Sequence, residues 1–221
     1  MALTTIKSGA IDSAAIALSS DAQDNTVAGS NAGDSFTGTD AIENTLFGKD
    51  TGTDITTADR NVAVGCETLA NITTGSDNTA CGMQSLFTST DSTRNAAFGY
   101  QALYANTSGS YNTAIGSMAM DSNTTGANNT SIGYQSLAGN TTGGALVAVG
   151  HQALHNNTTA NSNTALGRQS LYTNTTGAEN VAVGLQALYY STTASHNTAV
   201  GSYALVANTT AAGNTAVGHE S

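Results

Sequence analysis

The chain has 221 residues, and only 9% of them are charged, against about 25% in ordinary soluble domains. Its formal net charge of −10 argues against nucleic-acid binding, because a nucleic-acid interface needs a basic patch. The sequence contains no run of about 18 apolar residues, so it predicts no membrane insertion. Solubility must therefore come from uncharged polar groups, and the chain is rich in Asn, Thr and Ser.

Residues 1–24 do not match the pattern of the rest of the chain. They make a poor signal peptide, because Asp12 interrupts the apolar part that follows the single Lys7. We expect residues 1–24 to form an N-terminal cap or attachment segment, since the terminal units of repeat arrays are atypical. Residues 25–43 resemble one repeat with two extra residues, and we expect them to form a divergent first turn.

Residues 44–221 are an array of eleven 17-residue units, the last of which is incomplete. Each unit opens with a version of the word NTAVG, and we number its positions from the first residue of that word. Position 1 is Asn except at Leu146, and position 9 is Leu or Met in every full unit except the first. Position 5 is glycine throughout, which gives the structural repeat glycines Gly48, Gly65, Gly82, Gly99, Gly116, Gly133, Gly150, Gly167, Gly184, Gly201 and Gly218.

The repeat is too short for helices. Seventeen residues cannot hold the two amphipathic helices of a helical repeat, and Asn, Thr and Gly are poor helix formers. We therefore predict an all-β fold, a parallel β-solenoid (β-roll or β-helix) of 17-residue turns. Two short strands, at positions 1–4 and 6–10, would be separated by the glycine at position 5. Stacking would align an Asn ladder at position 1 and a Thr ladder at position 13.

The expected core consists of two apolar columns, at positions 4 and 9. Position 2, which is apolar in only some units, would contribute to the same core. The core column at position 4 is Phe47, Val64, Cys81, Phe98, Ile115, Ile132, Val149, Leu166, Val183, Val200 and Val217. Such a core is thin for a single chain. Small residues at positions 3 and 8 would let backbones approach closely, so we expect a homotrimeric rod of parallel chains.

The unit NTAVGxQALxxNTTGxx resembles the repeats of bacteriophage tail fibres, and MALTTIKSGAIDSAAI resembles the start of many tail-fibre proteins. The Asn-x-Ala-x-Gly word is also similar to the head repeats of trimeric autotransporter adhesins. The resemblance implies a structural fibre of a virion tail or a cell surface, attached at its N-terminus to a tail or baseplate protein. The alternative is a self-assembling extracellular filament, joined head to tail through residues 1–43 and the open C-terminal turn.

The sequence contains no catalytic or cofactor motif, so we expect neither an enzyme nor a cofactor. An aromatic column could stack on the sugars of a cell-surface glycan, or could be a ladder that stiffens the rod. Its members are Phe87, Tyr100, Tyr104, Tyr134, Tyr172 and Tyr189. The NTT segments have the form of glycosylation sequons, but a hydrogen-bonding ladder is the stronger interpretation. They begin at Asn123, Asn140, Asn157, Asn174 and Asn208.

Three small groups of side chains offer weaker alternatives. They are a metal pair at His151 and His155, a Ca²⁺ site at Asp50, Asp54 and Asp59, and a disulfide between Cys66 and Cys81. Solvent-facing histidines and carboxylates are the plainer interpretation, and we expect no metal site. Because position 4 is the expected core column, we expect Cys81 to be a buried, unpaired thiol.

Overall fold

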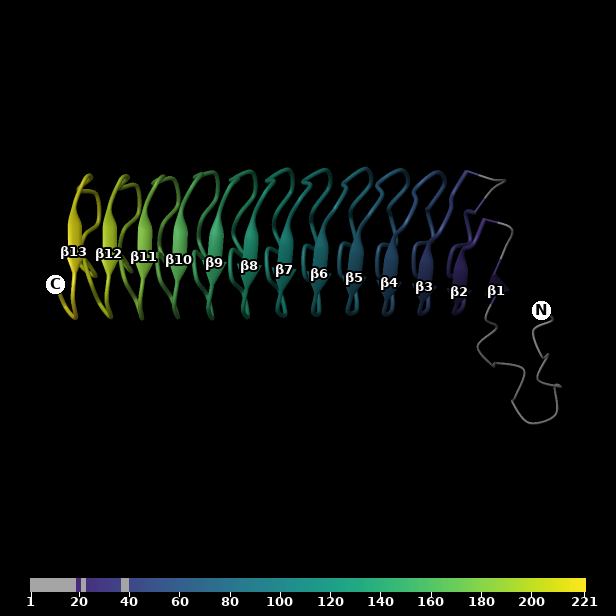
Figure 1. Ribbon diagram of the computed structural model, residues 1–221, viewed down its shortest axis with the longest axis horizontal. Coiled ribbons are helices and arrows are strands. Elements are labelled where there is room, and N and C mark those ends of the chain that lie inside the picture. The colour runs from purple at the N-terminus through teal and green to yellow at the C-terminus, as the bar shows by residue number, and fades with distance from the viewer. Residues whose placement is uncertain (1–18, 21–22, 37–39) are drawn as a thin grey trace, which may run out of the picture.

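A computed structural model describes residues 19–20, 23–36 and 40–221 and shows a rod of stacked turns (Figure 1). The described residues contain no helix, and none of them offers a helical segment that could cross a membrane. One short strand recurs in each turn. The strands are β1 (Ser19–Ser20), β2 (Thr26–Ala28), β3 (Thr45–Phe47), β4 (Val62–Val64), β5 (Thr79–Cys81), β6 (Ala96–Phe98), β7 (Thr113–Ile115), β8 (Thr130–Ile132), β9 (Val147–Val149), β10 (Thr164–Leu166), β11 (Val181–Val183), β12 (Thr198–Val200) and β13 (Thr215–Val217).

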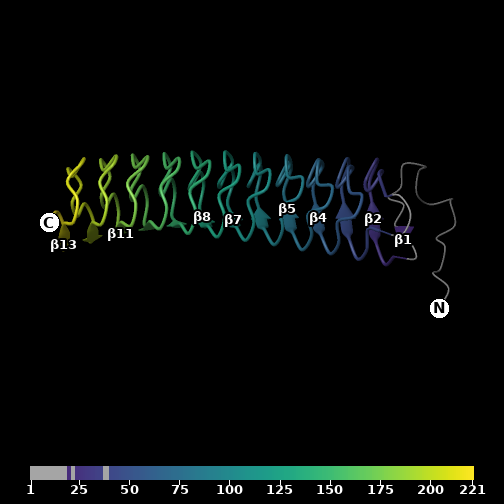
Figure 2. The same ribbon diagram turned by 90° about the horizontal axis from the view of Figure 1, so that it is seen from above.

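The strands form one sheet in chain order, so that β2 and β13 lie at opposite ends of the rod (Figures 1 and 2). From β3 onward each residue pairs with the residue 17 positions later, as Ala114 does with Ser131. Between β2 and β3 the offset is 19 residues, because Thr26 lies beside Thr45. All these pairs are parallel, and only β1 runs antiparallel to its neighbour β2. The predicted parallel β-solenoid of 17-residue turns is therefore confirmed. The expected cap at 1–24 lies outside the described residues except at 19–20 and 23–24.

The prediction of two strands per turn is wrong, because only positions 2–4 are extended. The chain beyond the glycine bends through left-handed residues at positions 7 and 9, as at Gln101 (φ 54°) and Leu103 (φ 55°). A third left-handed residue, such as Tyr111 (φ 61°), stands at position 17. This conformation is uncommon for residues other than glycine. Three such bends in each turn close the 17 residues into a loop, which gives the rod a compact cross-section.

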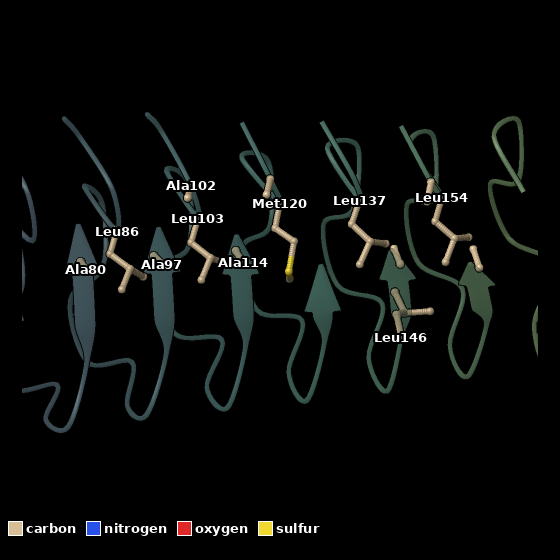
Figure 3. Packing of buried hydrophobic residues seen from close by; sticks show 14 of the residues in the cluster. Ala80, Leu86, Ala97, Ala102, Leu103, Ala114, Met120, Leu137, Leu146 and Leu154 are labelled. Atoms are coloured by element: carbon tan, nitrogen blue, oxygen red, sulfur yellow. The ribbon is translucent and has the colours of Figure 1, made fainter. Parts of the chain in front are cut away.

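The core lies at positions 3 and 9, and the prediction that position 4 forms a core column is wrong. Ala97 and Ala114 at position 3 and Leu103 at position 9 are fully buried (Figure 3). The position-4 side chains are instead exposed or half-buried. The residues that were wrongly assigned to the core are Phe47, Val64, Cys81, Phe98, Ile115, Ile132, Val149, Leu166, Val183, Val200 and Val217.

Size decides this orientation, because successive side chains of a strand point to opposite faces. In a three-residue strand, either position 3 or the pair at positions 2 and 4 must face inward. The rod is one turn thick, and the leucine at position 9 already fills much of its section. Only the methyl group of an alanine fits between that leucine and the strand, so the larger side chains at positions 2 and 4 point outward.

Buried asparagines form the polar part of the interior. Asn112 Nδ2 donates to the carbonyl of Gly126 (2.9 Å), and Asn112 Oδ1 accepts from the backbone N–H of Asn129 (3.0 Å). This arrangement, repeated at position 1, confirms the predicted Asn ladder. At Leu146 the ladder lacks one amide, so the side chain there offers no acceptor to the next turn.

A second buried ladder runs through position 12. Asn140 Nδ2 donates both to Asn123 Oδ1 (2.8 Å) and to the carbonyl of Gly143 (3.0 Å). Asn123, Asn140, Asn157 and Asn174 are fully buried, which supports the ladder interpretation of the NTT segments over glycosylation. The predicted Thr ladder at position 13 also forms, although each hydroxyl donates to a backbone carbonyl, as Thr124 Oγ1 does to Thr141 (2.9 Å).

Ser191 interrupts the position-12 ladder. Its hydroxyl oxygen and the Oδ1 of Asn174 are both buried and have no hydrogen-bond partner among the described residues. We expect Ser191→Asn to raise the free energy of unfolding by about 1–2 kcal/mol, because the new amide would donate to Asn174 Oδ1. Urea unfolding followed by circular dichroism measures the change. Ser191→Ala is the control, since it removes the unpaired hydroxyl but adds no donor to Asn174 Oδ1, and its gain should be smaller than that of Ser191→Asn.

Candidate binding surface

The strand face is the broadest regular surface of the rod. We call the residues at positions 2 and 4 of β3–β13 the strand-face stripe. Its position-4 column consists of the eleven residues from Phe47 to Val217 that were wrongly assigned to the core. Its position-2 column is Thr45, Val62, Thr79, Ala96, Thr113, Thr130, Val147, Thr164, Val181, Thr198 and Thr215. The stripe carries two parallel columns of side chains on one side of the sheet.

The position-4 column of the stripe is apolar, and the whole stripe is uncharged and accessible. Exposed fractions at position 4 reach 41% for Val64, 41% for Ile115 and 46% for Leu166. None of its 22 side chains is charged. Contiguous apolar patches of more than a few hundred Å² are rare on monomeric proteins and mark interaction sites. Sequence reasoning missed this surface because it placed position 4 inside the rod.

The predicted aromatic column does not form one stripe. At position 10, Phe87 stacks on Tyr104 with 5.3 Å between ring centroids, and Tyr172 stacks on Tyr189 at 5.2 Å. Asp121 and Ala138 occupy the same position between these two groups. The stacked rings cover one another's faces, which are the surfaces that a sugar would need.

Tyr100 and Tyr134 stand at position 6, apart from the position-10 stacks, and both are exposed. Tyr134 packs against His151 with 5.4 Å between ring centroids and a tilt of 31°. The six predicted aromatics are therefore divided into two stacks and two separate tyrosines. This arrangement favours the stiffening interpretation over a continuous sugar-binding platform.

A column of glutamines was missed by the sequence reasoning. At position 7, Gln101 Nε2 donates to Gln84 Oε1 (2.9 Å), and Gln186 Nε2 donates to Gln169 Oε1 (2.9 Å). The signal was the recurrence of Gln two residues after the repeat glycine. These amides pair with one another along the rod and so add a fourth side-chain ladder, which is partly exposed.

Asp121 is the one carboxylate in the position-10 column. Its Oδ1 atom is buried and receives no hydrogen bond within the part of the chain that the structure describes. Burial raises the pKa of this carboxyl group above its usual range, although the backbone N–H groups of Asp121 and Ser122 and the nearby His155 oppose the shift. The folded rod therefore binds this proton more tightly than the unfolded chain does.

We expect Asp121→Asn to stabilise the rod at pH 7 and to have little effect at pH 3. A raised folded-state pKa means that the stability contributed by Asp121 is fully present below its unfolded pKa, about 3.9. It is lost as the pH rises through the folded-state pKa. Thermal unfolding of both proteins at several pH values measures this. Asp91→Asn, at an exposed position, should give no such pH-dependent gain, and an equal gain would contradict the prediction.

The candidate metal and disulfide groups do not come together as sites. Asp50 pairs with Lys49 and accepts from Asn31 Nδ2 (2.8 Å), and the ion pair with Lys49 lowers its pKa. No group of three His, Cys, Asp or Glu side chains within residues 23–36 and 40–221 could hold a metal ion. Cys66 and Cys81 are both free, and Cys81 is exposed rather than buried as expected.

Several charged pairs stand in one column at position 17. Arg60 Nε donates to Asp77 Oδ1 (2.6 Å), and Arg94 lies over the ring of Tyr111 at 5.4 Å. The hydrogen bond from Arg60 lowers the pKa of Asp77. Because these groups are exposed, the pairs contribute little to stability.

The family model described as Imelysin (Peptidase_M75) matches residues 4–214. Neither the curated proteins nor the solved structures give a match. The assignment to bacteriophage tail-fibre repeats, drawn from the NTAVG word, is therefore wrong as a family assignment. The β-solenoid shape, which was predicted from the 17-residue repeat, is unaffected by this correction.

Proposed function

This chain belongs to the imelysin family, and we propose that it works as a structural rod that sets a fixed distance and presents its sides to a partner. The observation that supports this most is the continuity of the sheet, which runs in chain order from β2 to β13. Eleven intervals of about 4.8 Å give a length of roughly 53 Å. A repeat array of this kind contacts only its neighbouring turns and grows in one dimension.

The interior supports a mechanical role. Backbone pairing, the two buried Asn ladders and the Thr ladder each connect every turn to the next through much of the rod. Bending the rod would stretch several of these ladders at once. Placement on a virion or a cell surface, attachment to a tail or baseplate protein, glycan binding and head-to-tail filaments all remain predictions.

The proposed rod does not depend on self-association, and the original argument for a homotrimer no longer holds. The homotrimer was expected because small residues at positions 3 and 8 would line a contact between chains. Ala114 at position 3 and Ala119 at position 8 are instead fully buried within one chain. Any contact between copies must therefore use another surface.

Deleting whole units tests the rod. We expect deletion of residues 112–162, which are three units, to leave a folded rod that is shorter by about 14 Å. Deletion of 112–154 removes a similar length but breaks the 17-residue phase, and that variant should not form a regular rod. Small-angle X-ray scattering gives length and cross-section separately. A cross-section that changes with the three-unit deletion would contradict the proposal.

A second candidate function is peptide-bond cleavage, because the family is described as a peptidase. We propose that this chain does not act as one. Incubation of the purified protein with fluorescently labelled casein, with and without added divalent metal ions, tests this. We expect release of fluorescence equal to the buffer control. Cleavage that co-purifies with the 22.1 kDa chain would make the rod an enzyme or part of one.

A further inference from the structure

The strand-face stripe is large enough for a small interface. Its ten intervals between β3 and β13 give a length of roughly 48 Å, and two columns of side chains make it about 10 Å wide, so one copy offers about 480 Å². A pair of copies would bury about 960 Å² in total, the size of the smaller and weaker protein interfaces. Leaving this apolar area in water is unfavourable.

The period of the stripe indicates its partner. Side chains recur once per turn over eleven turns, so a partner must carry the same spacing to keep contact along the whole length. A second copy of this chain has that spacing. We propose that two copies pack face to face through their strand-face stripes, with the rods running in opposite directions.

The direction follows from which columns would meet. When two such faces pack with the rods antiparallel, the two-fold axis lies along the strands, so position 4 meets position 4 and position 2 meets position 2. With parallel rods the axis lies along the rod, and position 4 meets position 2. Position 4 is apolar in every unit, whereas position 2 is mostly Thr. The antiparallel arrangement therefore places apolar side chains on apolar side chains.

Charge supports the same direction. Twelve of the fifteen carboxylates lie in residues 1–91, and the later units are nearly neutral. Parallel rods would place the two acidic halves side by side and would increase their repulsion. Antiparallel rods place each acidic half beside a nearly neutral half. Carboxylates on two neighbouring rods repel one another when they lie within the Debye length, about 8 Å at physiological salt.

Full overlap of the two strand-face stripes, β3–β13, fixes the opposing turns. The end strands β3 and β13 would meet, as would β5 and β11 further in. The central strand β8 would meet its own copy at the two-fold axis. In that register Ile115 of one copy lies across from Val149 of the second copy, and Cys81 lies across from Val183.

The first test is the mass in solution. We expect multi-angle light scattering at micromolar concentrations to give about 44 kDa, twice the 22.1 kDa of one chain. Ile115→Lys should weaken the dimer at least about 100-fold, because pairing would bury an unpaired ammonium group. This change makes the net charge less negative, so repulsion between rods cannot explain the loss. Thr125→Lys, on an exposed position of the same turn, should leave the dimer intact.

The second test is cross-linking. We would use a bismaleimide of about 10 Å reach, the spacing of packed sheets, in a Cys66→Ser background. Antiparallel pairing predicts little cross-linked dimer with Cys81 alone and much more when Val183→Cys is added. Strong cross-linking through Cys81 alone would show parallel rods and overturn the proposed direction.

The pairing goes beyond the proposed function, and the two can fail separately. A monomer at every concentration, or a trimer of about 66 kDa, would overturn the face-to-face pair and leave the rod shape untouched. A loss of the dimer on Thr125→Lys equal to that on Ile115→Lys would also overturn it. Circular dichroism of each variant shows that the solenoid is still folded.

Discussion

Gly116→Ala will cut the rod into two poorly connected halves. A Cβ atom at Gly116 would lie 2.5 Å from the carbonyl oxygen of Gly133 in the next turn, which is closer than atoms can approach. The two turns must move apart, so the backbone hydrogen bonds between them must lengthen or break. The φ of 138° is also unfavourable for an alanine. We therefore expect the free energy of unfolding to fall by at least about 4 kcal/mol, which is at the upper end of the effects of single substitutions. Urea unfolding measures the loss, and limited proteolysis should cleave near the altered turn.

Gly218→Ala separates the two causes. Gly218 has nearly the same backbone conformation (φ 136°), but a Cβ there meets nothing nearer than 3.8 Å. This variant should show only the backbone strain of about 1–3 kcal/mol. Gly201→Ala supplies a clash at the same end of the rod, with 2.2 Å to the oxygen of Gly218. If Gly201→Ala and Gly218→Ala lower the free energy of unfolding by the same amount, the close contact between turns is not the reason that glycine is needed at position 5.

Asn112→Leu will destabilise the rod by about 1–3 kcal/mol. The change would leave the backbone N–H of Asn129 without its partner, whereas the carbonyl of Gly126 would keep the hydrogen bond from Asn123 Nδ2. A buried polar group without a partner costs about 1–3 kcal/mol. The leucine itself should fit, because Leu146 occupies the equivalent place in a later turn and is fully buried. Thermal and urea unfolding measure the loss.

Leu146→Asn is the reciprocal control. It would supply an acceptor to the N–H of Asn163, and these hydrogen bonds would offset the lost apolar burial of Leu146. We expect a change of less than about 1 kcal/mol. A loss as large as that of Asn112→Leu would mean that the interior responds to any substitution at position 1, rather than to the missing amide.

The period of the chain made the architecture predictable, whereas the inside of each turn was harder to assign. A 17-residue repeat with glycine at position 5 permits few structures other than stacked turns. The error at position 4 arose because hydrophobicity was given more weight than volume. Position 4 ranges from Cys81 to Phe98, and a tightly packed column would not accept such a range. Position 3 is Ala in nine of eleven units, and that restriction was the better sign of burial.

The bends could not have been predicted from residue type. Gln101 and Leu103 have positive φ angles, yet neither is a residue that favours them. Stacking decides their conformation, because the leucine must reach the interior within a short loop. The strand-face stripe was missed for a related reason, since its accessibility depends on which side of a three-residue strand faces the leucine.

These left-handed residues also determine how such a chain can begin to fold. A turn standing alone would hold three strained residues, each unfavourable by about 1–2 kcal/mol, with no neighbouring turn to stabilise them. A turn laid on one that is already formed gains its hydrogen-bond ladders and its share of the core at once. Nucleation is therefore slow and elongation fast, so a partly folded chain is a template that completes itself turn by turn.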